Sequence, residues 1–462
     1  MAASSVKRNF WITGATLVTQ NEKRQAVRAN LRIEDGRIAE ITRRAPKKLL
    51  PRAGDVDATG LTILPGFVQG HVHLCQTLFR NQADDMELMD WLQKRIWVFE
   101  AAHTADTLHT SALLGIHELL SGGTTTVLDM GTVRHTDAIF EAVQSTGIRA
   151  SVGKCLMDHP KTTPRTLRES TLQALKEAEE LYLRWNGREN DRIRVSYAPR
   201  FVVSCTEKLL LQVRDRAHER GALIHTHASE NLKEIRLVKD LVGCENVEYL
   251  HQLGLTSPHL VLAHCIWLKP NEKDLLRRSQ TKVVHCPSSN LKLASGLAHV
   301  PDLRARGITV ALGADGAPCN NNLNMWTEMR LAALLHKPGN GPKTLRAQEA
   351  LDMATREGAK ALSWSDSIGS IEVGKRADLI AVDLQTPENA LFSVGKEPHP
   401  ENLASQLVYS TQRHHVRQTW VDGKSVYQNG QVTGLPAGPL LERVFRAQKQ
   451  IRKSARLGVD NP

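Results

Sequence analysis

Eight short apolar runs, each long enough for a buried strand, alternate with helix-like segments between residues 61 and 315. Neighbouring parallel strands need a long crossover, usually a helix, so the alternation predicts a parallel sheet. Eight such units fit an α/β fold of the (β/α)8 TIM barrel type better than an open sheet. The predicted strands are 61–73, 124–130, 148–154, 193–199, 222–228, 259–265, 282–287 and 308–315.

The two ends of the chain look alike and differ from the middle. Residues 9–41 and 377–432 contain short alternating runs, with Asp35-Gly36 and Asp422-Gly423 as hairpin turns. Neither end has enough strands to bury a sheet face alone, so we expect both to pair in one small β-sandwich domain. The predicted domains are 1–63 and 377–432 for the β-sandwich, 64–376 for the barrel, and 433–462 for a C-terminal helix and tail.

The chain of 462 residues carries a formal net charge of +11, which would suit a nucleic acid if the excess lay in one patch. The densest basic run, ERVFRAQKQIRKSAR at 442–456, has apolar residues at near-helical spacing and no aromatic platform beside it. These features favour a surface helix over a nucleic-acid site. We therefore expect no nucleic-acid partner.

Cysteine usage and hydropathy bear on the compartment. The seven cysteines form no C-x-x-C motif and are odd in number, which argues against a disulfide framework. The stretch MAASSVKRNFWITGATLV lacks the apolar core of a signal peptide, and no apolar run approaches the roughly 20 residues that span a bilayer. We expect a cytoplasmic protein without a membrane segment.

Two histidines, His71 and His73, stand one residue apart at the end of the first predicted strand, in the stretch PGFVQGHVHL. Side chains alternate along a strand, so both imidazoles point the same way. Barrel enzymes carry catalytic groups at the C-terminal ends of their strands. Other predicted strand ends carry His225, His227, His264, His285 and Asp315. One histidine or aspartate alone can serve a core or a turn, but the set together predicts a metal site.

The ligands follow from the chemistry of the metal. A catalytic zinc ion takes nitrogen and oxygen ligands and keeps one position open for water. The predicted ligands are His71, His73, His227 and Asp315. His225 shares a strand with His227 but stands two residues deeper, so we prefer His227 and expect His225 in the core or behind the ligands.

A carboxylate follows the preferred ligand in HTHASE, where Glu230 stands three residues after His227. A metal lowers the pKa of its water toward about 7, and a nearby carboxylate can take the proton and return it to a leaving group. Glu230 is therefore the predicted general base, although a helix start would also favour a glutamate. His264, on the next strand, either polarises a substituent of the attacked carbon, steadies the attacking oxygen or is a plain core histidine.

The motifs GHVHL, HTHASE, LAHC, HCPSSNLKLASG and LGADGAPCNNN occur in this order, followed by GKRADLIAVD. In these motifs nearly the whole chain resembles the amidohydrolase superfamily, and within it the branch that deaminates methylthioadenosine, S-adenosylhomocysteine and 5'-deoxyadenosine. The resemblance implies one divalent metal ion, zinc or else iron, on the four ligands, with Glu230 as general acid/base and His264 beside it. Two-metal members use a lysine at the end of the fourth strand, and VSYAPRF contains none.

The resemblance also implies residues that hold the substrate. In that branch a glutamate downstream of the H-x-H pair binds the ribose hydroxyls, and Glu100 in IWVFEAAHT stands at that place. A basic group for a substrate carboxylate would fall near Lys154 or Arg165. If neither points inward, a substrate such as S-adenosylhomocysteine is disfavoured. Superfamily habit further implies a homo-oligomer.

These features predict a metal-dependent hydrolytic deaminase that converts an adenosine-type nucleoside to its inosine analogue and releases ammonia. Water activated by the metal would attack C6 of the adenine ring, and Glu230 would pass the proton to N1. One alternative keeps the mechanism with a free purine or an s-triazine as substrate of an aminohydrolase or chlorohydrolase. Another is a noncatalytic barrel assembly protein without the metal, which the retained ligands and Glu230 disfavour.

Overall fold

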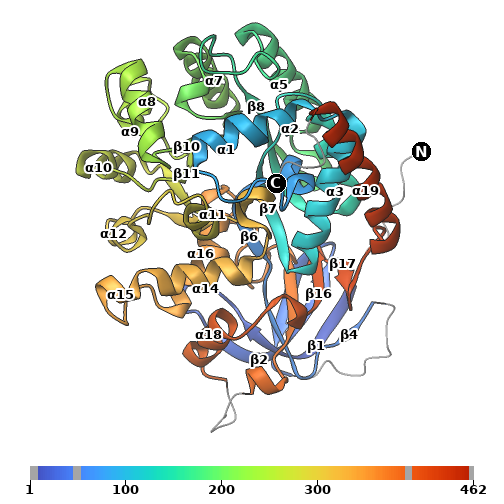
Figure 1. The fold of residues 1–462 in the computed structure, drawn as a ribbon. Helices are drawn as coiled ribbons and strands as arrows, with labels where there is room; N and C mark the ends of the chain where they lie inside the picture. Colours follow the sequence, from blue (N-terminus) through green and yellow to red (C-terminus); the bar gives the residue numbers. More distant parts are fainter. Residues whose placement is uncertain (1–8, 45–53, 391–397, 457–462) are drawn as a thin grey trace. The chain divides into compact units, whose positions relative to one another are not determined.

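The computed structural model describes residues 9–44, 54–390 and 398–456 (Figure 1). Contacts divide the chain into two compact units. Unit 1 comprises Met1–Val68, Leu119–Thr126 and Asn324–Gly434, and unit 2 comprises Gln69–Glu118, Val127–Leu323 and Leu435–Pro462. The outermost limits of the expected domains, residues 1 and 462, lie outside the described residues, and the inner limits stay predictions.

Strands from both ends of the chain form one sheet among the described residues of unit 1. They are β1 (Asn9–Val18), β2 (Ala26–Glu34), β3 (Arg37–Thr42), β4 (Val56–Asp57), β5 (Leu61–Pro65), β15 (Leu379–Asp383), β16 (Val416–Val421), β17 (Lys424–Gln428) and β18 (Gln431–Val432). Their order is β18-β17-β16-β15-β5-β1-β2-β3, with β4 beside β1. The two ends of the chain meet where β5 pairs with β15 and with β1. The expected pairing is thus observed, whereas a sandwich arrangement stays a prediction.

Two-residue turns set the register at two places in this sheet. Asp35-Gly36 joins β2 to β3, and Asp422-Gly423 joins β16 to β17. All four residues have φ between 48° and 78°, the left-handed region that such hairpin turns require. Both expected hairpins are confirmed. The sheet buries a hydrophobic core that includes Ile12, Leu31, Ile33, Ile63 and Leu379.

Helices pack together on the C-terminal part of unit 1. They are α14 (Met325–Leu335), α15 (Lys337–Asn340), α16 (Ala347–Ala354), α17 (Arg356–Ala361) and α18 (Pro400–Tyr409), with the 3-10 turns η4 (Pro387–Asn389) and η5 (Arg413–His415). Buried Asp352 of α16 accepts hydrogen bonds from Gln20 and Arg24, which follow β1. These bonds tie the helices to the sheet of the same unit.

A parallel sheet lies mainly in unit 2. Its strands are β6 (Phe67–His73), β7 (Thr124–Met130), β8 (Arg149–Leu156), β9 (Ile193–Pro199), β10 (Ile224–Ala228), β11 (Leu260–His264), β12 (Lys282–His285), β13 (Val310–Leu312) and β14 (Asp315–Gly316). Within the described part of the chain their order is β13-β12-β11-β10-β9-β8-β7-β6-β14. Every predicted barrel strand overlaps one of them, so the predicted parallel α/β arrangement is confirmed.

The first predicted strand, 61–73, is divided at Gly66. β5 ends at Pro65 and belongs to the sheet of unit 1, while β6 starts at Phe67 and belongs to the parallel sheet. A Cβ at Gly66 would lie 2.2 Å from Cγ2 of Thr125, so only glycine fits here. An apolar run does not show that its two halves pair with strands of different sheets. The sequence therefore predicts one continuous strand here.

The eighth predicted strand, 308–315, is also divided. β13 pairs with β12 and β14 pairs with β6, and Gly313 and Ala314 lie between them. A Cβ at Gly313 would lie 2.7 Å from the carbonyl oxygen of His71, so the close approach to β6 requires glycine. The sheet thus begins and ends in one short stretch of chain, which gives a TIM-barrel-like arrangement.

Helices follow the strands of this sheet along the chain, and the last of them, α19, comes after every strand (Figure 1). They are α1 (Leu88–Trp91), α2 (Trp97–Ala101), α3 (Ala105–Ser121), α4 (Asp137–Thr146), α5 (Thr171–Trp185), α6 (Arg188–Asp191), α7 (Glu207–Arg220), α8 (Leu232–Val242), α9 (Asn246–Gln252), α10 (Pro270–Ser279), α11 (Pro287–Lys292), α12 (Val300–Ala305), α13 (Ala317–Asn320) and α19 (Ala437–Ser454). Three shorter turns are η1 (Leu74–Phe79) and η3 (Val202–Ser204), which are 3-10, and η2 (Leu92–Ile96), which is π-helical.

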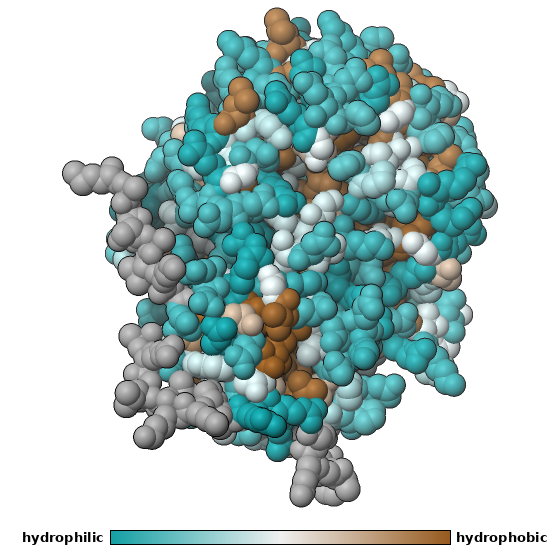
Figure 2. Space-filling view, turned by 180° about the vertical axis from the view of Figure 1, so that it is seen from behind, coloured by the Kyte–Doolittle hydropathy of each residue, from teal (hydrophilic) through white to brown (hydrophobic). Residues whose placement is uncertain are grey.

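The surface agrees with one expectation from the sequence. The basic segment lies largely in α19, which buries Leu440, Val444 and Ile451 and exposes charged residues, so the predicted surface helix is confirmed. On the face drawn in Figure 2, hydrophilic side chains predominate and apolar ones occur in scattered groups. No helix among the described residues is long and apolar enough to cross a membrane.

Candidate metal centre and active site

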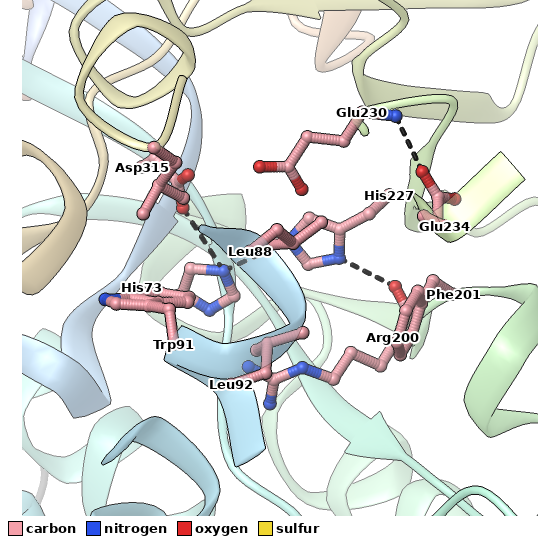
Figure 3. A pocket seen from close by; sticks show the side chains of 11 residues that line it. His73, Leu88, Trp91, Leu92, Arg200, Phe201, His227, Glu230, Glu234 and Asp315 are labelled. Atoms are coloured by element: carbon pink, nitrogen blue, oxygen red, sulfur yellow. Dashed lines mark hydrogen bonds and ion pairs between the residues drawn. The ribbon is translucent and has the colours of Figure 1, made fainter. Parts of the chain in front are cut away.

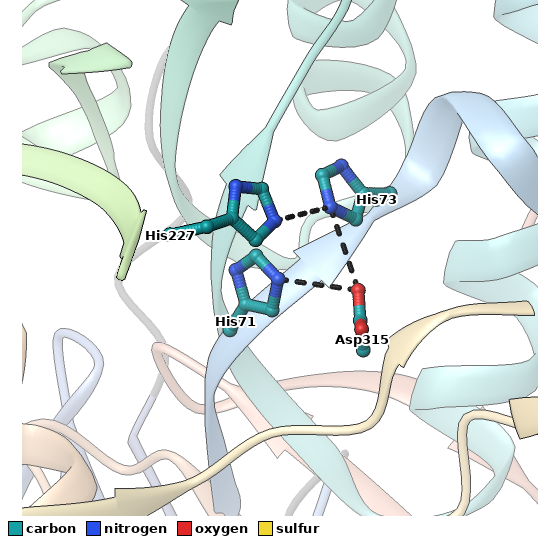
Figure 4. A group of neighbouring side chains, drawn as sticks. All are labelled: His71, His73, His227 and Asp315. Carbon is teal, nitrogen blue, oxygen red and sulfur yellow. Dashed lines mark hydrogen bonds and ion pairs between the residues drawn. The ribbon is translucent and has the colours of Figure 1, made fainter. Parts of the chain in front are cut away.

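The four predicted ligands meet at the C-terminal ends of the parallel strands (Figure 4). They are His71 and His73 of β6, His227 of β10 and Asp315 of β14, and one ligand-type atom of each lies within 4.8 Å of the others. Asp315 Oδ1 lies 3.2 Å from Nε2 of His71 and 3.4 Å from Nε2 of His73. The Nε2 atoms of His73 and His227 are 3.3 Å apart. The predicted set is therefore brought together by the fold.

Hydrogen bonds on the far sides of two rings decide where their protons lie. His73 Nδ1 is 2.9 Å from the carbonyl oxygen of Met130, and His227 Nδ1 is 2.7 Å from that of Arg200. A carbonyl only accepts, so each Nδ1 carries the proton and each Nε2 keeps a lone pair. Two lone pairs 3.3 Å apart cannot hydrogen-bond to one another. The arrangement fits a shared cation, and this donor set suits a divalent metal ion.

His225 contacts His71 from behind the four ligand-type side chains. It is fully buried, and its Nε2 lies 2.8 Å from His71 Nδ1. Burial first, and then the neighbouring His71 and His73, hold the pKa of His225 well below its ordinary value. A neutral His225 that accepts from Nδ1 leaves the Nε2 lone pair of His71 free to face the other ligands. His225 thus occupies the supporting place expected from its depth in the strand.

Asp315 is held in one orientation by its neighbours. Its Oδ1 accepts the N–H of Gly316 at 2.7 Å, and its Oδ2 accepts the hydroxyl of Ser289 at 2.7 Å. Burial alone would raise the pKa of Asp315, but the facing His71 and His264 lower it well below its usual range. The carboxylate is therefore ionised and directed at the imidazoles.

Glu230 and His264 face one another beside the ligand-type side chains. Glu230 lies in the loop after β10 and His264 ends β11, with 3.5 Å between Glu230 Oε2 and His264 Nε2. His264 Nδ1 lies 2.8 Å from Asn290 Oδ1, and its Nε2 lies 3.8 Å from Asp315 Oδ2. Burial would lower the pKa of His264, but Glu230 and Asp315 raise it above its ordinary value. In its protonated form, His264 has an Nε2–H that faces the space between these two carboxylates.

The titration of Glu230 suits proton transfer. Burial raises the pKa of Glu230 to about 7; His264 opposes the rise, and Asp315 adds to it. A carboxyl that titrates near neutral pH can accept a proton and give it back within one turnover. In Figure 3 the Glu230 carboxylate points into the space beside Asp315 and His227.

A cavity opens over these groups (Figure 3). Its polar side is formed by His73, Arg200, His227, Glu230, Glu234 and Asp315. Its apolar side is formed by Leu88, Trp91, Leu92, Phe201 and Leu293. Three of the apolar residues come from α1 and the π-helical turn η2, an irregularity that is frequent at functional sites.

Arg200, directly after β9, is the main site residue that sequence reasoning missed. Its carbonyl oxygen accepts from His227 Nδ1, and its side chain lines the cavity. The sequence signal that points to it is its place at the end of a predicted strand, in the stretch VSYAPRF. Glu234 and the apolar residues of the cavity were also missed.

Glu100, expected to bind ribose hydroxyls, does not line the cavity. Its Oε2 accepts from Arg200 Nη1 at 2.7 Å, and its Oε1 accepts from Gln76 Nε2 at 2.8 Å. All three side chains are buried. The carboxylate therefore neutralises Arg200. The expected ribose role of Glu100 stays a prediction.

Lys154 and Arg165, expected near a substrate carboxylate, do not line the cavity either. Lys154 is buried, with its Nζ 2.9 Å from Glu169 and 3.1 Å from Glu177. Its neighbour Cys155 lies 4.0 Å from Nη1 of the cavity residue Arg200, so strand alternation directs Lys154 to the opposite side of β8. Arg165 is exposed in a turn before α5.

Comparisons with known proteins agree with the motifs. A family model described as the amidohydrolase family matches residues 62–426. The 5'-deoxyadenosine deaminase of Methanosarcina acetivorans is 36% identical over 422 residues, 91% of this chain and 92% of that protein. The 5-methylthioadenosine/S-adenosylhomocysteine deaminase of Nitratidesulfovibrio vulgaris is 38% identical, over 95% of this chain and 96% of that protein. The crystal structure of an adenosine deaminase from Xanthomonas campestris with bound zinc matches with a TM-score of 0.87 and 31% identity, over 96% of this chain and 99% of that chain.

Proposed function

The chain belongs to the amidohydrolase family, and we propose that it is a metal-dependent hydrolase that deaminates an adenosine-type nucleoside to its inosine analogue and ammonia. The observation that carries the proposal is the pair Glu230 and His264, held 3.5 Å apart beside four ligand-type side chains. The relatives named above as deaminases of such nucleosides support the substrate class.

One divalent ion would be held by the four ligand-type side chains, with zinc as our first choice and iron as the alternative. The facing lone pairs of His73 and His227 support a cation at this place. When bound, the ion would lower the pKa of a water molecule and so supply a nucleophile near neutral pH. Since β9 ends at Pro199 and Arg200 follows it, this strand end offers no lysine to bridge a second ion.

Glu230 and His264 would then divide the proton chemistry. Glu230 takes a proton from the attacking water and passes it to N1 of the adenine ring, for which a pKa near 7 is well matched. His264 donates its Nε2–H to the oxygen as it adds to C6. Both side chains are buried, so these interactions act without competition from bulk water. Collapse of the tetrahedral carbon then breaks its bond to the amino nitrogen, to which Glu230 delivers the remaining hydroxyl proton, and ammonia is released.

The cavity wall bears on which nucleoside is used. The apolar side offers no partner for a charged group, and Arg200, the cation among the lining residues, is already paired with Glu100. Neither Lys154 nor Arg165 reaches the cavity. An uncharged 5' group, as in 5'-deoxyadenosine or methylthioadenosine, therefore fits better than the amino-acid tail of S-adenosylhomocysteine.

A free purine or an s-triazine is the second candidate substrate, and one observation favours it. A ribose site was expected to use the Glu100 carboxylate, but the side chain that lines the cavity is Arg200. Its guanidinium donates well to ring nitrogens and carbonyl oxygens. This arrangement would suit a planar heterocycle without a sugar.

A substrate panel tests the proposal. The zinc-loaded protein should be assayed by the ultraviolet change on deamination with adenosine, 5'-deoxyadenosine, methylthioadenosine, S-adenosylhomocysteine, adenine, guanine and a chlorotriazine. We expect the uncharged nucleosides to have the highest kcat/KM. A preference for guanine or the triazine would replace the substrate class with the second candidate. A metal-loaded protein inactive on every compound would contradict the proposed function.

Glu100→Ala is expected to lower kcat/KM for adenosine and for adenine by a similar factor, about tenfold to a hundredfold, because it releases the Arg200 side chain. Initial rates on both substrates measure this. Glu118 is buried, pairs with the half-buried Arg80 and does not line the cavity, so Glu118→Ala is the matched control and should keep both rates. A loss confined to adenosine would restore the ribose role of Glu100.

A further inference from the structure

Glu234, in the first turn of α8, lines the cavity beside Glu230 (Figure 3). Its Oε2 accepts the backbone N–H of Glu230 at 2.7 Å and, less closely, that of Asn231 at 3.4 Å. Its Oε1 accepts from Asn246 Nδ2 at 2.6 Å. The residue is 1% exposed, and both of its carboxylate oxygens accept hydrogen bonds from groups of the protein.

The bond from Glu230 is unusual for a glutamate at this helix position. A glutamate three residues after the N-cap normally accepts the N–H of the N-cap residue. Glu272 in α10 does so, with 2.8 Å between its Oε2 and the backbone N of Lys269. In α8 the N-cap is Asn231, yet the shorter bond goes to the residue before it. The carboxylate therefore holds the peptide of Glu230 as well as capping the helix.

Glu230 needs such an anchor because its backbone has left the strand. β10 ends at Ala228, and Ser229 has a φ of 53°, so the chain turns sharply just before Glu230. The carbonyl oxygen of Ser229 accepts a backbone N–H bond from Trp267, which holds one side of the turn. Glu234 holds the other side.

We propose that Glu234 is a positioning residue that fixes the peptide of Glu230 so that its carboxylate faces His264 and the ligand-type side chains. The inference rests on Glu230 as the proton carrier of the proposed function. Without the anchor the loop can rotate about Ser229, and a displacement of about 1 Å is enough to cost roughly a hundredfold in rate. The negative charge of Glu234 also favours the protonated form of Glu230. It adds to the rise in the pKa of Glu230 that burial causes.

Kinetics of two variants test the role. In the zinc-loaded enzyme, Glu234→Ala should lower kcat about a hundredfold and change KM by less than about threefold, with unchanged metal content. Glu234→Gln should recover most of that loss, because its amide oxygen still accepts the N–H of Glu230. Asn246 can turn its own amide to accept the new N–H, since its Oδ1 has no hydrogen-bond partner among the described residues.

Glu272 provides the matched control for a lost capping glutamate. It is buried and binds the backbone N atoms of Lys269 and Val247, but it does not line the cavity. Glu272→Ala should lower the melting temperature and leave kcat within about twofold. The inference is overturned if Glu272→Ala slows turnover as much as Glu234→Ala does. It is equally overturned if Glu234→Ala keeps kcat within about threefold.

Backbone hydrogen exchange gives a reading that does not depend on the reaction. The amide of Glu230 should exchange at least about tenfold faster in Glu234→Ala than in the parent, in Glu234→Gln or in Glu272→Ala. Unchanged exchange in Glu234→Ala would overturn the inference even if the rate fell. A parent enzyme that deaminates none of the panel would refute the proposed function instead, and the exchange result would still decide what Glu234 holds.

Discussion

Glu230→Gln is expected to keep its metal and to lose about three to four orders of magnitude in kcat. The proposed reaction uses this one carboxylate twice, to take a proton from the attacking water and to deliver it to the ring. Glutamine has the same size and still accepts a hydrogen bond, but it cannot take up a proton. Since Glu230 is not one of the four ligand-type side chains, metal occupancy should not change.

Metal analysis and initial rates on the same preparation check this result. Glu272→Gln makes the same change in another buried glutamate that does not line the cavity, and it should keep kcat within about twofold. A metal-loaded Glu230→Gln enzyme with a kcat near that of the parent would remove Glu230 from the reaction.

The four ligand-type side chains could be predicted because regular backbone geometry places them. Alternation along β6 puts His71 and His73 on one side, and the ends of parallel strands bring His227 and Asp315 to the same edge. Depth along β10 also separated His227 from His225, which lies behind His71 in the structure. Each of these inferences needs only the period of a strand and the direction of a sheet.

Side chains that depend on irregular backbone or on a distant partner could not be placed in this way. Leu88, Trp91 and Leu92 reach the cavity from a one-turn helix and a π-helical turn, and neither has a periodicity that shows which side points inward. The predicted partner of Glu100 is a ribose, whereas in the structure the guanidinium of Arg200, directly after β9, binds its carboxylate. Tertiary packing decides which side chain pairs with Glu100, and no sequence pattern near Glu100 predicts that partner.

Asp315→Asn is expected to weaken metal affinity by at least about a hundredfold and to remove most of the activity of the protein as purified. Asp315 is the one carboxylate among the four ligand-type side chains, so the change removes the negative charge that faces the ion. The fold should tolerate it. The amide oxygen still accepts the N–H of Gly316, and the hydroxyl of Ser289 can turn to accept the new N–H.

Metal titration separates the loss of a ligand from a general disturbance at the strand ends. Excess zinc should restore part of the activity of Asp315→Asn along a binding curve shifted to higher zinc concentration.

Asp129→Asn is the matched control. Asp129 is buried near the end of β7, accepts the N–H of Leu74 at 2.7 Å and is not a ligand-type residue of the site. Burial raises the pKa of Asp129 to about 7, so an uncharged amide is a mild change there and metal content should stay at the parent level. Full occupancy with full activity in Asp315→Asn would reduce Asp315 to a turn residue. Equal metal loss in both variants would show that any altered carboxylate at these strand ends disturbs the site.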